Sequence, residues 1–259
     1  MKRSTTKKIS RIHEEKMSTQ KEKDYRQLLD EYFAKSIGSN VEKMENFAKY
    51  VPRQMLTRFL SKYELFKKVL NIHGSIVECG VYLGGGAMTF AHLSSILEPV
   101  NWQRQVVGFD TFSGFKNLSE ADKKTSKSEF MKEDGLSVDS YQDLQCSISL
   151  FDQNRFLGHL PKVQLIKGDV RETIPDYLEK NPHTVISLLY LDFDVYEPTK
   201  IALESFLPRM PKGAIVAFDE LNAPNWPGET IAVMETLGIK YLRLERFQFD
   251  TLISYAVLE

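Results

Sequence analysis

The chain has 259 residues, a formal net charge of −1 and a hydrophobic fraction of 42%. This composition is typical of a globular protein with a sizeable core, and the balanced charge does not favour nucleic acid or an anionic membrane as a partner. No apolar run is long enough to span a bilayer. The two cysteines, Cys79 and Cys146, have no metal-ligand spacing, so we predict a reduced, cytoplasmic protein.

The N-terminal region differs in composition from the rest. Residues 1–23 are lysine-rich and nearly free of aliphatic side chains, which predicts a flexible basic tail. Residues 24–72 are predicted to form a helical cap, with amphipathic helices over 24–35 and 54–70. Residues 73–259 are then expected to form the main domain.

Within the main domain, strands and helices alternate. Short aliphatic or β-branched runs predict strands at 75–78, 106–110, 163–167, 186–192 and 214–219. Helical patterns such as 199–207 lie between them. This alternation predicts an α/β fold with a parallel sheet and helices on both faces. Two final strands, 241–247 and 251–257, flank a turn at 248–250, so the last strand is expected to run antiparallel.

The connection over residues 111–160 is unusually long and contains a predicted helix at 140–151. Connections of this length in compact domains are often lids or binding segments. A mobile surface insertion is the alternative, and the sequence leaves both open.

The first predicted strand runs into a glycine-rich turn that includes Glu78, Gly80 and Gly84. Glycine lets the backbone approach a ligand, and the helix predicted to open near Met88 supplies free N–H groups. The spacing is not G-x-G-x-x-G, and Glu78 would repel a pyrophosphate. The carboxylate instead suits a cation such as the ammonium or sulfonium of S-adenosylmethionine. A purely structural turn is the alternative.

Two further acidic residues end predicted strands. Asp110 ends the second strand, where a carboxylate in doubly wound folds accepts hydrogen bonds from ribose hydroxyls. We include the adjacent Thr111 and Ser113 among the predicted cofactor contacts. Asp169 follows the third strand and is predicted either to contact the adenine amino group or to cap the next helix.

Four carboxylates follow the fourth and fifth strands: Asp192, Asp194, Asp219 and Glu220. Strand alternation would place Asp192 and Asp194 on one side. Carboxylates gathered at neighbouring strand ends repel one another unless a cation lies among them, and oxygen ligands select Mg²⁺, Ca²⁺ or Mn²⁺ over zinc. Helix capping by Asp194 and salt bridges to basic side chains are the alternative.

Taken together and in order, these motifs resemble those of the macrocin O-methyltransferase family, whose members methylate sugar hydroxyls. The matching segments are Glu78–Val81, Gly108–Phe112, Lys167–Asp169, Asp192–Thr199 and Phe218–Glu220. The resemblance covers about residue 46 to the C-terminus. It implies that 73–259 is a class I methyltransferase domain, a Rossmann-like seven-stranded sheet of order 3-2-1-4-5-7-6 with strand 7 antiparallel.

The resemblance also implies roles for single residues. Glu78, Gly80, Asp110 and Asp169 would hold S-adenosylmethionine, with Gly84 and Asp192 as further cofactor contacts. Asp192, Asp219 and Glu220 would hold Mg²⁺ or Mn²⁺, and Asp194 would be the general base. The family usually has Asp-Asp where this chain has Asp219-Glu220, which makes Glu220 an unusual ligand.

The resulting prediction is a metal-dependent O-methyltransferase that acts on a deoxysugar, either nucleotide-linked or part of a glycosylated natural product. A catechol or phenolic acceptor and a non-catalytic ligand-binding protein on the same fold are the alternatives. An NAD-dependent oxidoreductase fits less well, because its fingerprint glycines are absent. We expect a homo-oligomer and neither a nucleic-acid nor a membrane partner.

Overall fold

The computed structural model describes residues 19–259, so most of the predicted tail lies outside the described residues. The chain divides into two compact units, 1–56 and 57–259. The predicted division of the chain at residues 23 and 72 stays a prediction.

The first unit contains α1 (Gln20–Lys35), α2 (Asn40–Glu45) and the short 3-10 helix η2 (Phe47–Lys49). Capping boxes start both α-helices: Thr19 pairs with Glu22, and Ser39 pairs with Glu42. Helix α1 therefore begins four residues before the predicted start at Asp24, because its capping signal lies inside the lysine-rich stretch.

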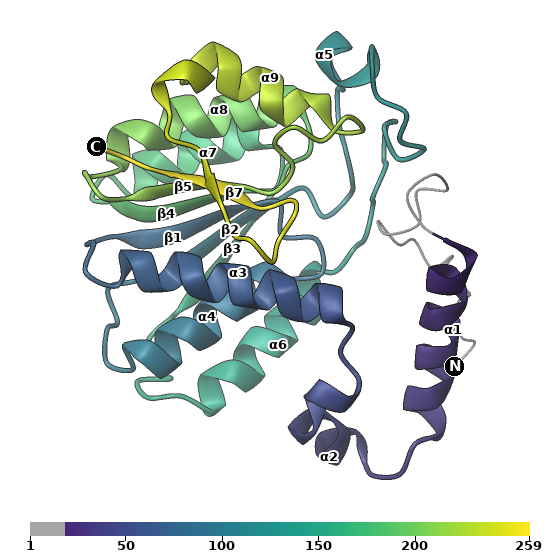
Figure 1. The fold of residues 1–259 in the computed structure, drawn as a ribbon. Coiled ribbons are helices and arrows are strands. Elements are labelled where there is room, and N and C mark those ends of the chain that lie inside the picture. Colours follow the sequence, from purple (N-terminus) through teal and green to yellow (C-terminus); the bar gives the residue numbers. More distant parts are fainter. Residues whose placement is uncertain (1–18) are drawn as a thin grey trace. The chain divides into compact units, whose positions relative to one another are not determined.

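The second unit is built around one sheet. Its strands are β1 (Ser75–Cys79), β2 (Val106–Asp110), β3 (Val163–Lys167), β4 (Ile186–Leu191), β5 (Ile215–Phe218), β6 (Glu245–Arg246) and β7 (Ser254–Val257). Its helices are α3 (Arg53–Val69, which begins in the first unit), α4 (Gly85–Leu97), α5 (Glu120–Lys123), α6 (Tyr141–Gln153), α7 (Val170–Lys180), α8 (Tyr196–Phe206), α9 (Pro227–Thr236) and the 3-10 helices η3 (Leu207–Arg209) and η4 (Ile239–Tyr241). Figure 1 shows their arrangement.

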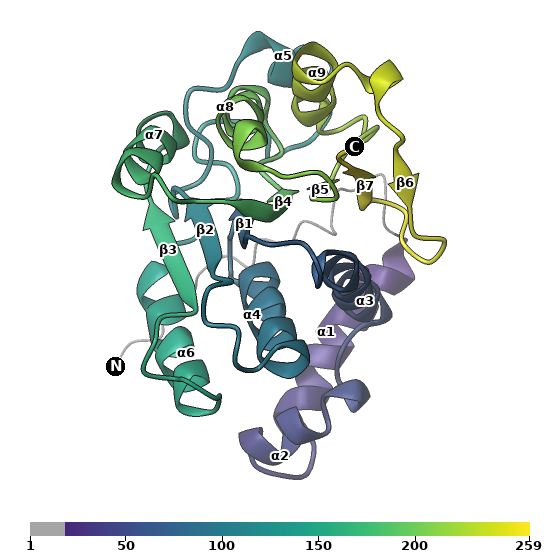
Figure 2. The same ribbon diagram turned by 90° about the vertical axis from the view of Figure 1, so that its left-hand side faces the viewer.

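The strand order is β3-β2-β1-β4-β5-β7-β6, and β7 runs antiparallel to both β5 and β6. This confirms the predicted class I methyltransferase sheet. Helices α4 and α6 and most of α3 cover one face, and α7, α8 and α9 cover the other (Figure 2). Each face has its own buried apolar cluster, because inward side chains alternate along every strand. Among residues 19–259, we find no helix with the length and apolar character that crossing a membrane requires.

The C-terminal hairpin departs from the prediction in its turn. A three-residue turn at 248–250 was expected, but β6 ends at Arg246 and β7 begins only at Ser254. The buried Asp250 organises the longer loop: its carboxylate accepts hydrogen bonds from the N–H groups of Leu252 and Ile253 and from the hydroxyl of Ser61 in α3.

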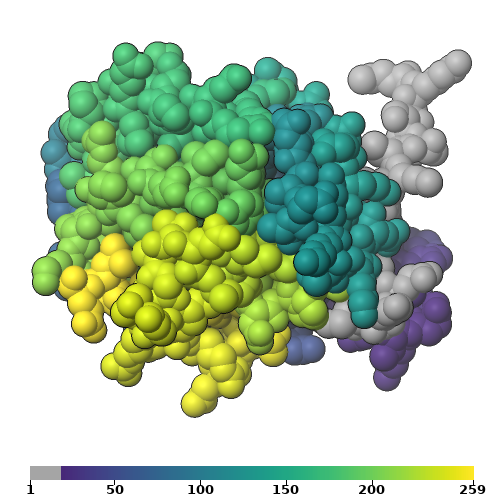
Figure 3. All heavy atoms as spheres, turned by 90° about the horizontal axis from the view of Figure 1, so that it is seen from above, coloured from purple at the N-terminus to yellow at the C-terminus, as the bar shows by residue number. Residues whose placement is uncertain are grey.

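The long connection over 111–160 is attached to the domain at several points. The buried Asp122 of α5 accepts a 2.7 Å hydrogen bond from the N–H of Tyr196 at the start of α8. Ser126 donates to the carbonyl of Asn225 just before α9, at 2.6 Å. In Figure 3 the teal surface of the connection lies against the green and yellow surface of α8 and α9. These contacts hold this part of the connection beside the carboxyl ends of β4 and β5.

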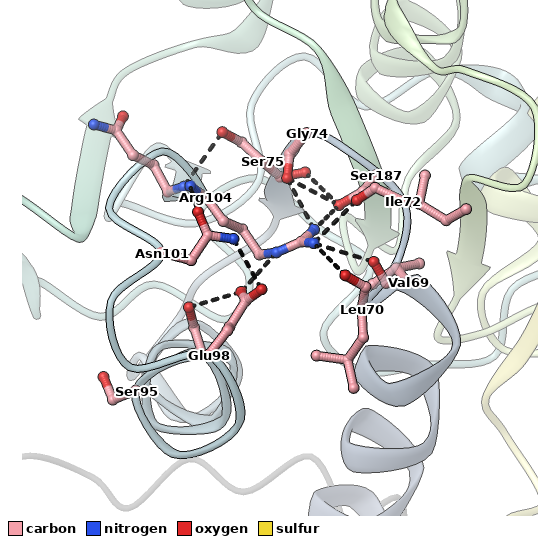
Figure 4. A network of polar contacts seen from close by, with 12 residues as sticks. Val69, Leu70, Ile72, Gly74, Ser75, Ser95, Glu98, Asn101, Arg104 and Ser187 are labelled. Atoms are coloured by element: carbon pink, nitrogen blue, oxygen red, sulfur yellow. Dashed lines mark hydrogen bonds and ion pairs between the residues drawn. The ribbon is translucent and has the colours of Figure 1, made fainter.

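The amino ends of the central strands β1, β2 and β4 are held by Arg104, whose side chain is 3% exposed. Its guanidinium forms an ion pair with Glu98 at 2.6 Å and donates to Ser187. It also donates to backbone carbonyls at the end of α3 and just after it, namely those of Val69, Leu70, Ile72 and Gly74 (Figure 4). One side chain thus satisfies carbonyls that the end of a helix leaves unpaired.

We expect Arg104→Met to destabilise the protein by about 3–5 kcal/mol, because it leaves the partly buried carboxylate of Glu98 and several carbonyls without their cation. Urea unfolding followed by circular dichroism measures the change. Arg243→Met is the control, since the side chain of Arg243 is 84% exposed in its pair with Glu245. A loss below about 1 kcal/mol for Arg104→Met would show that the network is replaceable.

Candidate functional site

The carboxyl end of β1 presents a buried carboxylate to the start of α4. Glu78 is 2% exposed and accepts a hydrogen bond from the N–H of Ala87. Its Oε2 has no hydrogen-bond partner within residues 19–259. Burial raises the pKa of Glu78 to about 8, although the Lys62 ammonium opposes this shift. An acceptor atom of this kind, buried and unsatisfied, suits a donor that arrives with a ligand.

The glycines around Glu78 make room for close backbone approaches. Gly80 has φ +94°, and a Cβ there would lie 2.0 Å from the carbonyl oxygen of Asp192. A Cβ on Gly86 would lie 1.7 Å from Oε1 of Glu78. Gly84, at φ +81°, is the N-cap of α4, which therefore begins at Gly85 and not near Met88. The free N–H groups of α4 consequently open beside the carboxylate.

Asp110 ends β2 and is already used by the backbone around it. Its Oδ2 accepts 2.8 Å hydrogen bonds from the N–H groups of Val81 and Tyr82, and Oδ1 accepts one from Phe112. A carboxylate has about four lone-pair sites, so a half-buried Asp110 retains capacity for a hydroxyl donor. Its present contacts join the β1 and β2 loops into one surface.

Thr111, Ser113 and Asp169 each have a local structural role. The hydroxyl of Thr111 donates to the carbonyl of Gly114 and accepts from the N–H of Ser113. Asp169 is the N-cap of α7, accepting from the N–H of Arg171, and its carboxylate also pairs with the Arg171 side chain. The capping alternative for Asp169 is thus realised, while all three residues lie at the carboxyl side of the sheet.

The carboxylates after β4 and β5 lie at adjacent strand ends. Leu191 and Phe218 are paired in register, and the N–H of Asp219 donates to the carbonyl of Leu191. Asp192 and Asp219 therefore leave the sheet side by side. The alternation argument does not apply to Asp194, because β4 ends at Leu191 and Asp194 takes a left-handed backbone, φ +65°. Asp194 is nevertheless buried, with 1% exposure.

Two basic residues of α3 reach these carboxylates, and the sequence analysis did not identify either. Arg58 forms an ion pair with Oδ2 of Asp219 through both terminal nitrogens, with Nη1 at 3.2 Å. The hydroxyl of Tyr190 donates to Oδ1 of Asp219 at 2.6 Å and accepts from Nζ of Lys62 at 3.0 Å. Burial alone would raise the pKa of Asp219, but the charges of Arg58 and Lys62 lower it to about 2.

This arrangement does not fit the predicted metal ligands as they stand. Both oxygens of Asp219 are engaged, one by a guanidinium and one by a phenol. Among residues 19–259 no three His, Cys, Asp or Glu side chains are arranged to hold a metal ion. A divalent cation is predicted to supply the positive charge next to Asp219, but in this structure Arg58 supplies it.

Comparisons with known proteins show the family to which the chain belongs. The family model for macrocin O-methyltransferase (TylF) matches residues 64–235. The chain belongs to the macrocin O-methyltransferase family. A crystal structure of CalS11, a calicheamicin methyltransferase, is 36% identical to the chain, with 93% of each chain covered and a TM-score of 0.88.

A second structure of CalS11, described as apo TDP-rhamnose 3′-O-methyltransferase, is 35% identical over 93% of this chain and 95% of that one, with a TM-score of 0.79. The O-methyltransferase NovP, 21% identical over 78% of this chain and 79% of its own, with a TM-score of 0.61, shares the fold. No curated protein sequence matches the chain. The protein is therefore an S-adenosylmethionine-dependent O-methyltransferase.

Another side chain of this methyltransferase escaped the sequence analysis. Glu229 in the first turn of α9 is fully buried, and its Oε1 accepts a 3.0 Å hydrogen bond from the N–H of Glu220. Burial raises its pKa well above the usual value, and the neighbouring carboxylates of Asp219, Asp194 and Asp192 act in the same direction. Glu229 therefore fixes the backbone of the turn that carries Glu220.

A signal for Lys62 was present in the sequence. Lys62, Leu65, Phe66 and Val69 recur at helical spacing on one face of α3, so a lysine stands in the apolar stripe. A charge at such a position is rarely buried without a partner. Arg58 gives no comparable signal, since the edge of an amphipathic helix commonly carries arginine.

Proposed function

We propose that this enzyme transfers a methyl group from S-adenosylmethionine to a hydroxyl of a deoxysugar that is nucleotide-linked or attached to a glycosylated natural product. The observation that carries the proposal is the 36% identity to CalS11 over 93% of both chains. CalS11 is described as a TDP-rhamnose 3′-O-methyltransferase. At this level of identity and coverage, a related acceptor class is the expectation.

We assign the cofactor to the carboxyl ends of β1, β2 and β3. The unsatisfied Oε2 of Glu78 would accept from the cofactor ammonium, and the remaining lone pairs of Asp110 would accept from ribose hydroxyls. Thr111 and Ser113 shape the loop beside Asp110, and Gly80 and Gly84 keep the surface open. Asp169 would contact the adenine amino group with oxygen capacity left over from its capping role.

We assign the acceptor to the carboxyl ends of β4 and β5, with Asp192 between cofactor and acceptor and Asp194 as the general base. The base takes the proton from the acceptor hydroxyl as the oxygen attacks the methyl carbon, and the methyl–sulfur bond breaks in line. Burial of Asp194 keeps water from competing for the proton. Much of the acceleration comes from holding the two reactants together, an effect that reaches effective molarities of about 10⁵ M or more.

The divalent cation, Mg²⁺ or Mn²⁺ at Asp192, Asp219 and Glu220, is proposed only for a state in which Arg58 has left Asp219. A cation bound there would lower the pKa of an acceptor hydroxyl. The proton transfer to Asp194 described above does not depend on it. Full turnover in excess EDTA would contradict the cation and leave the methyl transfer intact.

The test starts with a calorimetric titration of S-adenosylmethionine into the full-length protein. Mass spectrometry then follows methylation of TDP-rhamnose, of other nucleotide-linked deoxysugars and of catechol in parallel. We expect micromolar cofactor binding and a methylated sugar. Methylation of catechol alone would contradict the acceptor class, and cofactor binding without any methyl transfer would favour a ligand-binding protein.

We also propose that the enzyme is a cytoplasmic homo-oligomer. Several large apolar side chains of the first unit are exposed: Tyr25, Leu28, Val41, Met44 and Phe47. Exposed apolar groups of this kind are typical of subunit contacts. A monomer mass by light scattering at micromolar concentration would contradict this proposal.

A further inference from the structure

Asp219 is the most completely paired carboxylate of the site. Its side chain is fully buried. Oδ2 accepts from both terminal nitrogens of Arg58, and Oδ1 accepts from the hydroxyl of Tyr190 at 2.6 Å. Lys62 adds a second positive charge by donating to that hydroxyl at 3.0 Å. The negative charge of Asp219 is thus already balanced by side chains of α3.

A divalent cation and Arg58 cannot both use Asp219 in this arrangement. Mg²⁺ requires carboxylate oxygens at about 2.0–2.1 Å in a near-octahedral geometry. Oδ2 has two lone-pair directions, and both receive N–H groups of the guanidinium. Two positive groups on one buried carboxylate would also repel each other strongly, because screening by water is weak there.

The two basic residues differ in their freedom to leave. The side chain of Arg58 is 26% exposed, whereas that of Asp219 is fully buried. Lys62 is buried, at 7% exposure, between Tyr190 and Glu78. Arg58 is therefore the group that can be displaced from Asp219, and Lys62 stays beside Glu78 at the cofactor end of the site.

We propose that Arg58 and a divalent cation are alternative partners of Asp219, so that the cation binds only after Arg58 has been displaced. This inference rests on the cation of the proposed function and defines what limits its binding. Arg58 competes with the cation: it neutralises the charge of Asp219 when the cation is absent, and the free energy of that ion pair weakens cation binding. The same pairing keeps the turn after β5 in place while the site is empty of acceptor.

The test measures cation binding directly, with Mn²⁺ titrated into full-length protein and free Mn²⁺ followed by electron paramagnetic resonance. Arg58→Met removes the competing charge and is expected to tighten Mn²⁺ binding roughly ten- to a hundredfold. Arg58→Lys keeps a positive charge and is expected to stay closer to the wild type. Lys67→Met is the matched control: it removes an ion-paired charge of the same helix, the partner of Glu64, and is expected to change binding by less than about twofold.

Arg58→Met leaves a buried carboxylate without its cation, so its thermal stability is measured with and without Mn²⁺. We expect a lowered melting temperature that Mn²⁺ raises, and no such rise in Arg58→Met combined with Asp219→Asn. Equal or weaker Mn²⁺ binding by Arg58→Met, or no binding by any variant, would overturn the proposal. Absence of Mn²⁺ binding in every variant would also contradict the proposed cation. Neither result bears on the proposed methyl transfer, which fails only if the wild type does not bind S-adenosylmethionine or methylates no sugar.

Discussion

Asp194→Asn is expected to lower kcat for methyl transfer to the sugar acceptor by about 10²–10⁴-fold, because the amide cannot take the hydroxyl proton. Cofactor affinity should stay within about twofold of the wild type, since Asp194 is assigned to the acceptor side. Asparagine is the informative replacement at this position. The backbone there is left-handed, φ +65°, and asparagine adopts that conformation more readily than alanine does.

The same chain offers a matched control for this substitution. Asp134 also has a left-handed backbone, φ +58°, but its side chain is 66% exposed and pairs with Lys116. Asp134→Asn should leave kcat and cofactor binding unchanged. Single-turnover assays, with product quantified by mass spectrometry, separate the chemical step from product release. If Asp194→Asn kept more than about a tenth of the wild-type rate, another group would have to be the base.

The positions of the strand ends were predictable, because each strand is a short apolar run followed by an acidic or glycine-rich segment. Glu78, Asp110 and Asp219 were placed at the carboxyl end of the sheet from that pattern alone, and the structure has them there. The strand order came from the family resemblance, since order is a long-range property that local patterns do not encode. The antiparallel last strand followed from the terminal hairpin.

The partners of the carboxylates were not predictable in the same way. Arg58 and Asp219 are 161 positions apart in the sequence, and only packing of α3 against the sheet brings them together. From the expected repulsion among the carboxylates we predict a metal ion, with salt bridges to basic side chains as the alternative, and the metal ion stays a proposal. The structure balances Asp219 with Arg58 and Lys62, and it uses a buried glutamic acid, Glu229, to hold the adjacent turn.

Local backbone conformation was the other limit of sequence reasoning. The alternation that relates Asp192 to Asp194 holds only inside a strand, and β4 ends at Leu191. Asp194, with its left-handed backbone, then redirects the chain into α8. The relative orientation of the Asp192 and Asp194 side chains is therefore determined by a turn and not by the pleat of a strand.

Glu78→Gln is expected to weaken S-adenosylmethionine binding about ten- to a hundredfold, because a charge-assisted hydrogen bond to the cofactor ammonium is lost. Calorimetry at pH 7 measures the change. Glutamine keeps the shape of the side chain next to Gly86, where a Cβ would already clash with Oε1. Glu64→Gln in α3 is the control, since that side chain is 37% exposed and pairs with Lys67. Unchanged affinity in Glu78→Gln would remove Glu78 from the cofactor site.

The same substitution is expected to make the ligand-free protein more stable than the wild type, by a margin that grows as the pH rises. The pKa of Glu78 is raised from 4.5 to about 8 on folding, so the folded state holds a proton that the unfolded state releases between these values. The stabilisation is complete below pH 4.5 and is lost as the pH approaches 8, at ~1.4 kcal/mol per pH unit at most. Glutamine does not titrate, so urea unfolding at pH 5, 6, 7 and 8 should show its advantage over the wild type growing to at most on the order of 4 kcal/mol. If the free energies of unfolding of the two proteins instead changed in parallel with pH, Glu78 would be ionised in the folded state at pH 7 and Lys62 would already neutralise it. A difference in free energy of unfolding that grows with pH would mean that the buried acid at the cofactor site lowers the stability of the enzyme.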